Sequence, residues 1–359
     1  MEEKIVPIII PSLEPDERLT QLVRALAGAQ LGPIVLVDDG SGENYRARFE
    51  ECRDVYGCIH LQHAVNLGKG RALKTAFNYC LNTWPGLVGC VTADSDGQHT
   101  PHCIERVRDA LLASPDSLVL GVRDFDAPGV PDKSRLGNKI TCRVCAWSCG
   151  VKVSDTQTGL RAIPTAFMRH LMEVPGERFE FETRMLVETK GRCAICEVPI
   201  ETVYDSKENH TTHFNAVRDS VRIYRVLAAQ LVRFLFSSLG SGVLDVLLFW
   251  LLCGLLRGRF FAYAAVATVG ARVCSACVNY LLNYTVVFHS SAGRGRAAVR
   301  YVALAACQMC LSAALVTGAV SLLPPGISEL WAKLPIDFVL FFFSYVIQRE
   351  FVYKKKQDL

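Results

Sequence analysis

Hydropathy along the chain changes once, near Gln230, and this change separates two kinds of structure. Before it, short apolar runs alternate with charged, amphipathic stretches. After it, the apolar blocks reach about 20 residues, the length at which a helix crosses the hydrocarbon core of a bilayer. We therefore expect an α/β domain followed by an all-α domain of four transmembrane helices. The four spans are predicted at roughly 234–256, 260–282, 301–323 and 335–353.

Charge is distributed unequally between the two parts. From Leu231 onward the chain holds 12 Lys and Arg against 5 Asp and Glu, whereas the preceding part holds 27 against 30. A first part without basic excess argues against nucleic acid as a partner. Basic residues mark the cytoplasmic ends of membrane helices, and here they follow the second span and close the chain. We predict a multi-pass protein of the cell (inner) membrane, with the α/β domain and both termini in the cytoplasm.

The first 213 residues are predicted to form the cytoplasmic domain. Its strand and helix signals alternate in the order β-α-β-α, which is typical of a Rossmann-like domain with a mainly parallel sheet. In such a sheet, ligands bind at the carboxyl ends of the strands. Apolar runs predict strands at Val6–Pro11, Ile34–Val37, Ile59–Gln62 and Leu87–Val91, and amphipathic stretches predict helices at Asp16–Gly28 and 66–83.

Residues 214–230 have the pattern of a separate amphipathic helix. Its apolar positions lie beside a basic stripe formed by Arg218, Arg222 and Arg225. A helix with these two faces suits the surface of an anionic membrane leaflet. We therefore predict a juxtamembrane helix over 214–230, followed by the transmembrane domain over 231–359.

Fifteen cysteines are present, and several form Cys-x-x-Cys pairs. Two of these pairs lie inside apolar blocks, where cysteine packs as a small hydrophobic residue. We expect reduced thiols in a cytosolic domain rather than zinc or redox sites.

Two carboxylates, Asp94 and Asp96, follow the predicted strand Leu87–Val91. At this spacing they can share a divalent cation through hard oxygen ligands, and the cation can hold a diphosphate. The same residue types also form ordinary solvated turns. A second signal is Gly68-Lys69-Gly70, which places flexible backbone and a cation at a helix N-terminus, where anions bind.

Several short motifs occur in a defined order: Pro11-Ser12, 37–41, 66–70 and 94–99, then 134–139, 155–161 and 179–186. This ordered set resembles the family 2 glycosyltransferases, which have the GT-A fold. The later motifs resemble the branch that makes polyprenyl-phosphate sugars, to which dolichol-phosphate mannose synthase belongs. The resemblance covers roughly Ile5 to Tyr204.

The resemblance implies an inverting, metal-dependent glycosyltransferase, and it implies a role for each matching residue. The nucleotide-sugar would contact Pro11, Asp38, Asp39, Lys69 and Asp94. Asp94, Asp96 and Gln98 would hold the divalent cofactor, Mg²⁺ or Mn²⁺. The acceptor phosphate would meet Arg123, Arg135, Lys139 and Arg161. Catalysis would depend on Asp96, Arg123, Arg135 and Glu182.

The chemistry of the acceptor decides whether a general base is needed. Transfer to a hydroxyl requires one, and Glu182 is the candidate. A phosphomonoester has a second pKa of about 6, so it is already dianionic at neutral pH and needs cationic groups instead. Arginine suits this task because its planar fork grips phosphate oxygens in pairs. We expect a polyprenyl (undecaprenyl or dolichyl) phosphate acceptor and a UDP-linked donor.

The second part of the chain, Leu231 to Tyr353, resembles the GtrA-like membrane family through motifs around Arg233, Asn279–Phe288 and 348–353. Members of that family are associated with lipid-linked sugar metabolism. The segments Asn279–Phe288 and Ser344–Phe351 also resemble each other, which indicates an internal repeat of helix pairs.

Ionisable side chains within membrane spans are costly and face a bundle interior or a water path. The predicted spans carry Asp245, Arg272 and Asp337. We predict that Arg272 pairs with Asp245 or with Asp337.

Two alternatives remain open at this stage. One is a glycosyltransferase that acts on a glycan or glycolipid hydroxyl, and the other is a lipid-linked-sugar translocase whose first domain only binds nucleotide. The transferred sugar, the donor base, the metal and the prenyl length are also open, as is association of the chain into a homo-oligomer.

Overall fold

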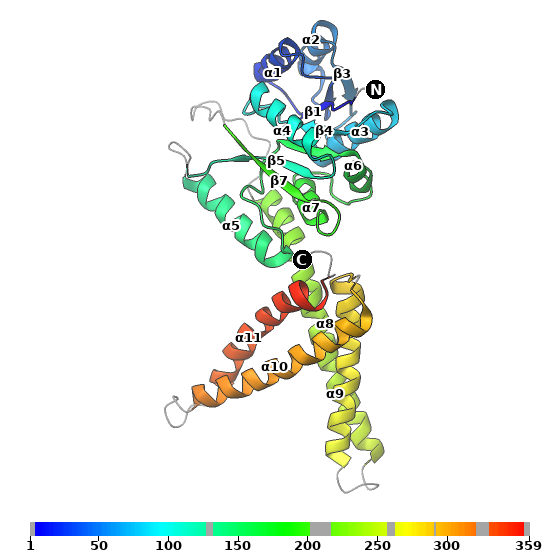
Figure 1. The fold of residues 1–359 in the computed structure, drawn as a ribbon, viewed down its shortest axis with the longest axis vertical. Coiled ribbons are helices and arrows are strands. Elements are labelled where there is room, and N and C mark those ends of the chain that lie inside the picture. The colour runs from blue at the N-terminus through cyan, green and yellow to red at the C-terminus, as the bar shows by residue number, and fades with distance from the viewer. Residues whose placement is uncertain are drawn as a thin grey trace. The chain divides into compact units, whose positions relative to one another are not determined.

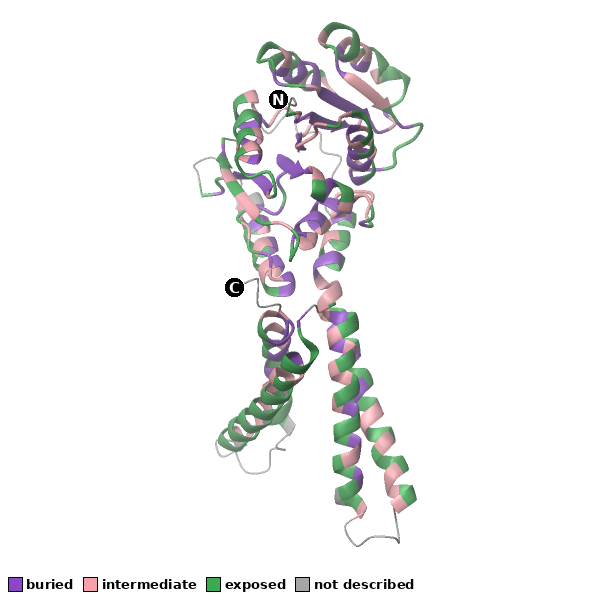
Figure 2. Cartoon of the chain, turned by 45° about the vertical axis from the view of Figure 1, so that its right-hand side comes forward, coloured by how far each residue is buried: buried purple, intermediate pink, exposed green. Residues whose placement is uncertain are grey.

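The computed structural model describes residues 4–126, 132–201, 217–256, 263–290, 292–320 and 330–354. The chain divides into two compact units, Met1–Leu227 and Ala228–Leu359. Figure 1 labels the elements of both units, and Figure 2 shows which parts of each are buried.

A seven-stranded sheet forms the centre of the first unit (Figure 1). Its strand order is β3-β2-β1-β4-β6-β5-β7. Only β6 runs antiparallel to its neighbours, and the other strand pairs are parallel, so the predicted mainly parallel α/β sheet is confirmed. The strands are β1 Ile8–Ser12, β2 Ile34–Asp38, β3 Ile59–Gln62, β4 Gly89–Thr92, β5 Leu118–Arg123, β6 Arg161–Pro164 and β7 Ile195–Ile200.

Helices cover both faces of this sheet. Alternate residues of a strand point to opposite faces, and accordingly Ile8 and Ile10 pack into one core while Ile9 packs into the other. Local signals fix where helices begin, as at Asp16, whose side chain accepts from the N–H of Arg18. The helices are α1 Glu17–Gly28, α2 Arg46–Tyr56, α3 Lys69–Thr83, α4 Pro101–Ala113, α5 Asp132–Cys149, α6 Thr165–Leu171 and α7 Glu180–Glu188, with a 3₁₀ turn, η1, at Glu43–Tyr45.

The register of the parallel strands brings their carboxyl ends to one edge. Ser12 at the end of β1 pairs with Asp38 at the end of β2, and Thr92 at the end of β4 pairs with Ile9 of β1. The residues that follow β2 and β4, including Asp39 and Asp94, therefore leave the sheet at the same edge. This edge is where ligands bind in open α/β sheets.

The second unit is helical. It contains most of α8 Arg218–Leu256, together with α9 Tyr263–Leu282, α10 Arg294–Val320 and α11 Leu330–Ile347. Among the described residues, three helices are long and apolar enough to cross a membrane, at Arg218–Leu256, Arg294–Ala319 and Trp331–Val352. The protein is thus a membrane protein with about three transmembrane helices.

The prediction of four spans is confirmed only in part. Helix α9, which corresponds to the predicted span 260–282, is not among the three candidate spans. The fourth span therefore remains a prediction, since α9 is on average at least as apolar as α8 and α10. A second difference concerns α8, which runs without a break through residues expected to form a separate juxtamembrane helix and the first span.

The two helix pairs of the second unit end in the same way. A π-helical turn, η2 at Asn283–Val287, follows α9, and a second, η3 at Gln348–Val352, follows α11. Asn283 and Gln348 each begin such a turn, and the Asn283 side-chain amide donates to Gln348 Oε1 at 3.1 Å. This arrangement supports the predicted internal repeat.

The three ionisable side chains predicted within the spans, Asp245, Arg272 and Asp337, are all paired. Arg272 Nη2 lies 3.3 Å from Asp245 Oδ2, which confirms the first of the two pairings predicted from the sequence. The Ser275 hydroxyl also donates to Asp245, at 2.9 Å. Asp337 pairs instead with Lys333, at 2.9 Å, and accepts from Ser312 at 2.8 Å. Both carboxylates thus have a counter-charge or donor, as burial in a bilayer requires.

Reversing the charge of Arg272 tests whether its pair with Asp245 stabilises the helices. Arg272→Glu should sharply reduce the yield of monodisperse protein in size-exclusion chromatography, because two carboxylates then face each other in an apolar medium. The double change Asp245→Arg with Arg272→Glu should restore most of the yield. Arg296→Glu, at an exposed position of α10, serves as the matched control. A normal yield for Arg272→Glu alone would rule out this role of the pair.

Candidate active site

Lys69 is the first residue of α3, and a glycine fixes its position. Gly68, the N-cap of this helix, has φ +105°, a conformation that favours glycine. A Cβ at Gly68 would also overlap the carbonyl of Glu177, because the segment before α7 packs directly on this turn. The N–H of Arg71 donates to the same carbonyl, at 3.0 Å. The start of α3 is therefore held against the start of α7.

The Lys69 ammonium group lies between two carboxylates. Its Nζ is 2.7 Å from Asp94 Oδ1 and 3.0 Å from Glu182 Oε2. Burial disfavours the charged form of Lys69, but the two carboxylates outweigh this effect and raise its pKa. For Asp94, burial is likewise outweighed by the charge of Lys69, and the pKa is lowered. Lys69 and Asp94 are therefore both ionised near neutral pH.

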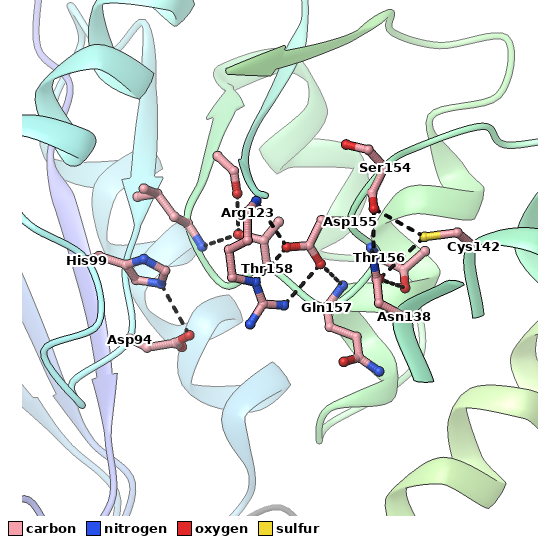
Figure 3. A network of polar contacts seen from close by, with 12 residues as sticks. Asp94, His99, Arg123, Asn138, Cys142, Ser154, Asp155, Thr156, Gln157 and Thr158 are labelled. Carbon is pink, nitrogen blue, oxygen red and sulfur yellow. Dashed lines mark hydrogen bonds and ion pairs between the residues drawn. The ribbon is translucent and has the colours of Figure 1, made fainter. Parts of the chain in front are cut away.

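The backbone at Gly159 packs closely against the Asp94 carboxylate. A Cβ at Gly159 would overlap the Asp94 carboxylate, so only glycine fits there. The Thr92 hydroxyl fixes the Gly159 carbonyl at 2.8 Å. On another side, His99 Nε2 lies 3.5 Å from Asp94 Oδ2 (Figure 3). His99 is buried, and neither ring nitrogen has a hydrogen-bond partner within the described part of the chain.

Asp96 lies beside this group under different electrostatic conditions. Burial and the negative charge of Asp94 raise its pKa. Its Oδ1 accepts from the backbone N–H of Gln98, at 3.1 Å. Two neighbouring, partly buried carboxylates that repel each other gain from a shared cation, and carboxylate and amide oxygens are ligands that Mg²⁺ and Mn²⁺ accept. The donor set of Asp94, Asp96 and Gln98 therefore fits the predicted divalent cation.

The protein alone does not supply a complete cation site here. In the described ranges, no group of three or more His, Cys, Asp or Glu side chains is arranged to hold a metal ion. Magnesium commonly takes one or two carboxylates and completes its coordination with water and substrate phosphates. The geometry of Asp94 and Asp96 is compatible with that mode.

Asp38 and Asp39 are both buried and hold the neighbouring loops. Asp39 accepts from the N–H of Gly68 at 2.8 Å and from the N–H of Leu67 at 3.0 Å, and it lies 2.8 Å from His63 Nδ1. Asp38 accepts from the N–H of Ser41 and from the side chain of Gln62. Asp39 thus couples the end of β2 to the turn that positions Lys69.

Pro11, the other residue expected at the nucleotide, is buried within β1 opposite Val37 of β2. No contact of Pro11, Asp38 or Asp39 with a nucleotide is tested by this structure, and these roles remain predictions.

Arg123, at the end of β5, forms a bidentate pair with Asp155 (Figure 3). Its Nε lies 2.7 Å from Asp155 Oδ2, and its Nη2 lies 3.0 Å from Oδ1. Asp155 is fully buried and also accepts from the N–H of Gln157. The guanidinium group of Arg123 stacks over the Phe125 ring, 4.9 Å from its centroid. The arginine is therefore locked in orientation while part of its side chain stays exposed.

Arg161 occupies a different environment from the one predicted. Its side chain is fully buried, and it donates to the backbone carbonyls of Thr158, Thr156 and Glu182. A guanidinium group with no exposed surface has none to offer an acceptor phosphate, so we do not assign this role to Arg161. The residue instead ties β6 to the start of α7.

Arg135 and Lys139 lie one turn apart on α5. Arg135 Nε donates to the Phe125 carbonyl at 2.8 Å, and Lys139 Nζ pairs with Asp126 at the same distance. Both residues therefore contact the segment that follows Arg123. The cationic groups predicted at the acceptor phosphate are thus gathered at one place, with the exception of Arg161.

Several site residues received no role from the sequence. His63 bridges Asp39 and Thr75, and His99 lies against Asp94. Asn138 fixes the loop before β6 by donating to the Ser154 carbonyl and accepting from the N–H of Thr156 (Figure 3). The signal for His99 was its position directly after Gln98. The other contacts join segments too far apart in the sequence to be recognised.

Removing the charge of Lys69 tests its pairing. Lys69→Met should lower the free energy of unfolding at pH 7 by about 2–4 kcal/mol, at the low end of the cost of breaking a buried pair, because Asp94 is 30% exposed. Thermal unfolding of the full chain in detergent, followed by tryptophan fluorescence, should show a melting temperature roughly 5–10 °C lower.

The loss of stability in Lys69→Met should depend on pH, because the pKa of Asp94 changes when its counter-charge is removed. Without Lys69, burial raises the pKa of Asp94 above that of the unfolded chain. The folded variant then binds more protons than its unfolded state, so the deficit should shrink as the pH falls from 7 to 5. A deficit that is constant across this range would contradict the assignment.

Gly159→Ala tests the close contact with Asp94. The added methyl group must displace the carboxylate or the backbone, and overpacking of this kind costs about 1–3 kcal/mol. Gly137→Ala is the matched control, because a Cβ at this helical glycine meets no atom within 4 Å. The same unfolding measurement should show a clear loss for Gly159→Ala and no loss for Gly137→Ala. Equal stabilities would show that the site around Asp94 relaxes freely.

Two protein families match this chain. Residues 8–162 match the family "Glycosyl transferase family 2", and residues 233–353 match "GtrA/DPMS, transmembrane domain". Members of the glycosyltransferase family commonly use divalent cations, which agrees with the donor set at Asp94 and Asp96.

Two archaeal proteins are similar to the first part of the chain. One is the uncharacterized protein MJ1222 of Methanocaldococcus jannaschii, which is 27% identical over 202 residues, or 55% of this chain and 81% of that protein. The other is the UDP-N-acetylglucosamine–dolichyl-phosphate N-acetylglucosaminyltransferase of Methanococcus voltae. It is 26% identical over 222 residues, which is 57% of this chain and 88% of that protein.

Among solved structures, Staphylococcus aureus TarS 1–349 is similar at 15% identity and a TM-score of 0.40, over 78% of this chain and 86% of that one. Its complex with UDP matches at 12% identity and a TM-score of 0.39, over 96% and 90% of the two chains. The two family matches fall separately on the two parts of the chain: the first lies within the α/β unit, and the second lies within the helical unit. The chain is a family 2 glycosyltransferase domain fused to a GtrA/DPMS transmembrane domain.

Proposed function

We propose that this glycosyltransferase moves a sugar from a UDP-linked donor to the phosphate of a polyprenyl lipid, with inversion at the anomeric carbon. The observation that carries the proposal is the fusion itself, because a sugar-transferring domain and a GtrA/DPMS membrane domain occur in one chain. The name of the Methanococcus voltae relative, which gives UDP-N-acetylglucosamine and dolichyl phosphate as its substrates, supports both the donor and the acceptor.

The donor would bind at the edge where β1, β2 and β4 end. Asp94, Asp96 and Gln98 would hold Mg²⁺ or Mn²⁺, which as a Lewis acid supplies charge neutralisation for the nucleoside-diphosphate leaving group. Lys69 would add a positive charge at the N-terminus of α3, and helix N-termini are places where phosphate oxygens bind. Asp39 keeps the preceding turn in place, so that Lys69 stays between Asp94 and Glu182.

The burial of Glu182 and its ion pair with Lys69 favour a phosphate acceptor over a hydroxyl acceptor. A general base for a hydroxyl needs a free carboxylate within reach of the acceptor. Glu182 is only 11% exposed and is paired with Lys69. A lipid phosphate needs no base, since one of its charged oxygens attacks the anomeric carbon directly. The bond from that carbon to the β-phosphate oxygen breaks, and the nucleoside diphosphate departs with the electron pair.

Two anions must meet in this reaction, so cationic residues have to lower their repulsion. Arg123, held rigid by Asp155, is the strongest candidate for the acceptor phosphate, with Arg135 and Lys139 close to it along the chain segment 123–139. The rigid fork of Arg123 is suited to grip two phosphate oxygens. We place this chemistry on the cytoplasmic face of the cell membrane, as the distribution of basic residues predicts.

A transfer assay tests the proposal. Purified protein in detergent, given undecaprenyl phosphate, Mg²⁺ or Mn²⁺ and a panel of UDP- and GDP-sugars, should release nucleoside diphosphate from one donor only when lipid is present. Chelation with EDTA should abolish release, and either metal should restore it. Lipid-independent release, or none from any donor by folded protein that binds nucleotide, would contradict the proposal.

A single substitution separates the proposal from its rival, a translocase with a nucleotide-binding domain. Asp96→Ala should reduce transfer by about a thousandfold or more, because the leaving diphosphate loses part of its charge stabilisation. Asp109→Ala, on the exposed surface of α4, serves as the control and should transfer normally. Undiminished transfer by Asp96→Ala would remove the proposed cation site from the mechanism.

A further inference from the structure

A pocket lies between the helices of the second unit. Side chains from α8, α9, α10 and α11 all line it, and its volume is about 310 Å³. This is at the lower end of the range found for small-molecule sites. Its residues concentrate towards one end of the helical unit, since Phe234 lies early in α8, Asn279 lies near the end of α9, and Gln348 follows α11.

The lining of the pocket is unusually polar for a membrane unit. It includes the polar side chains of Ser238, Asn279, Gln308, Asp337, Ser344 and Gln348. Helix association explains part of this polarity, because Gln348 bonds to Asn283 and to Ser344. It does not explain Gln308, which has no hydrogen-bond partner among the described residues. An amide in an apolar medium without a partner is costly, so a ligand is the natural partner.

Aromatic side chains form another part of the wall. Phe234 and Phe341 are in contact, with ring centroids 5.1 Å apart, and Tyr301 also lines the pocket. The faces of such rings carry partial negative charge. They attract the weakly positive C–H groups on the faces of a sugar ring, while the amide and hydroxyl groups serve its edges.

The polar groups fit hydroxyls better than they fit phosphate. Each sugar hydroxyl both donates and accepts, and the side-chain amides of Asn279, Gln308 and Gln348 offer both functions. The lining residues include no Lys or Arg, and their single carboxylate, Asp337, is already paired with Lys333. A phosphate group would thus lack a counter-charge here, whereas an uncharged sugar ring would find donors, acceptors and ring faces.

The backbone also singles out this place. Gln348 begins the π-helical turn η3, and its counterpart Asn283 begins η2. Isolated π-turns are rare in helices and occur frequently at functional sites. Here they bring the amides of the two helix pairs together beside the pocket, at 3.1 Å.

We infer that this pocket binds the sugar of a polyprenyl-linked sugar, with the phosphate left outside it. The inference rests on the proposed function, since that reaction makes a lipid of this kind. The membrane domain would then recognise the glycosylated lipid and not only anchor the enzyme. This role requires that binding depend on the sugar, because a site for the prenyl chain or phosphate would accept the unglycosylated lipid equally well.

Photolabelling locates the bound sugar directly. The probe is farnesyl-phosphate N-acetylglucosamine with a diazirine on its N-acyl group, and the sample is the full chain in nanodiscs of phosphatidylcholine and phosphatidylglycerol. Peptide mapping should place the label on α10 and α11, near Gln308 and Ser344. Unmodified farnesyl-phosphate N-acetylglucosamine should compete, whereas farnesyl phosphate should not.

Matched variants test the pocket itself. Ala305→Phe fills it and should lower labelling about tenfold, whereas Ala306→Phe, on the next position of α10 and outside the lining, should not. Gln308→Leu is a second variant in case Ala305→Phe does not fold. It removes only the unpartnered amide and should also lower labelling. Equal labelling of these variants and wild type, label confined to residues 4–201, or equal competition by farnesyl phosphate would overturn the inference.

One further variant separates this inference from the proposed function. Asp96→Ala, tested above for loss of transfer, should still be labelled at Gln308 and Ser344. Loss of transfer with intact labelling supports both proposals. Labelling of a wild-type protein that transfers no sugar would overturn the proposed function alone, and transfer without labelling of the pocket would overturn this inference alone.

Discussion

The pairing of Lys69 with Asp94 and Glu182 is the interaction on which the catalytic unit depends. It joins three segments, since Lys69 begins α3, Asp94 follows β4 and Glu182 lies in α7. Two buried carboxylates at one place would repel each other, and the ammonium group between them removes that cost. Gly68 and Gly159 exist where they do because any larger residue would push one of the partners out of position.

This pairing also leaves the site with a charge imbalance that suits its chemistry. Lys69 compensates for only part of the negative charge of Asp94, Asp96 and Glu182. Burial and the negative charge of Asp94 raise the pKa of Asp96, and no ion pair of Asp96 is present among the described residues. The proposed divalent cation and diphosphate would together complete such a site, while Glu182, already paired with Lys69, is poorly placed to act as a base.

The sequence was informative where local signals decide structure. Apolar runs predict β1 to β4, and the order of the motifs indicates the family. It was less informative where distant segments meet. The antiparallel strand β6 and the burial of Arg161 follow from pairings with β4 and β5, which no local pattern encodes.

The same limit explains the remaining site residues. Arg123 was recognised as cationic, but its partner Asp155 lies 32 positions away, and the bonds from Asp39 to Gly68 span 29 positions. In the membrane part, hydropathy predicted four spans, and three of them correspond to candidate spans among the described residues. Hydropathy also could not show that α8 continues without a break, because its basic and apolar stretches have different compositions but the same backbone conformation.

The contact between Asn283 and Gln348 has a consequence for how the helical unit is assembled. Equivalent residues of two repeats touch each other only near the axis that relates the repeats, as in a symmetric dimer. The two helix pairs correspond to the two protomers of a symmetric dimer, except that a loop connects them in one chain. In lipid, apolar surfaces give little selectivity between partners, so a matched pair of amides can specify which faces meet and in what register. The α8–α9 and α10–α11 hairpins can therefore insert one after the other during synthesis, and the second recognises the first through polar contacts that include this amide pair and the bond from Tyr345 to Gln230.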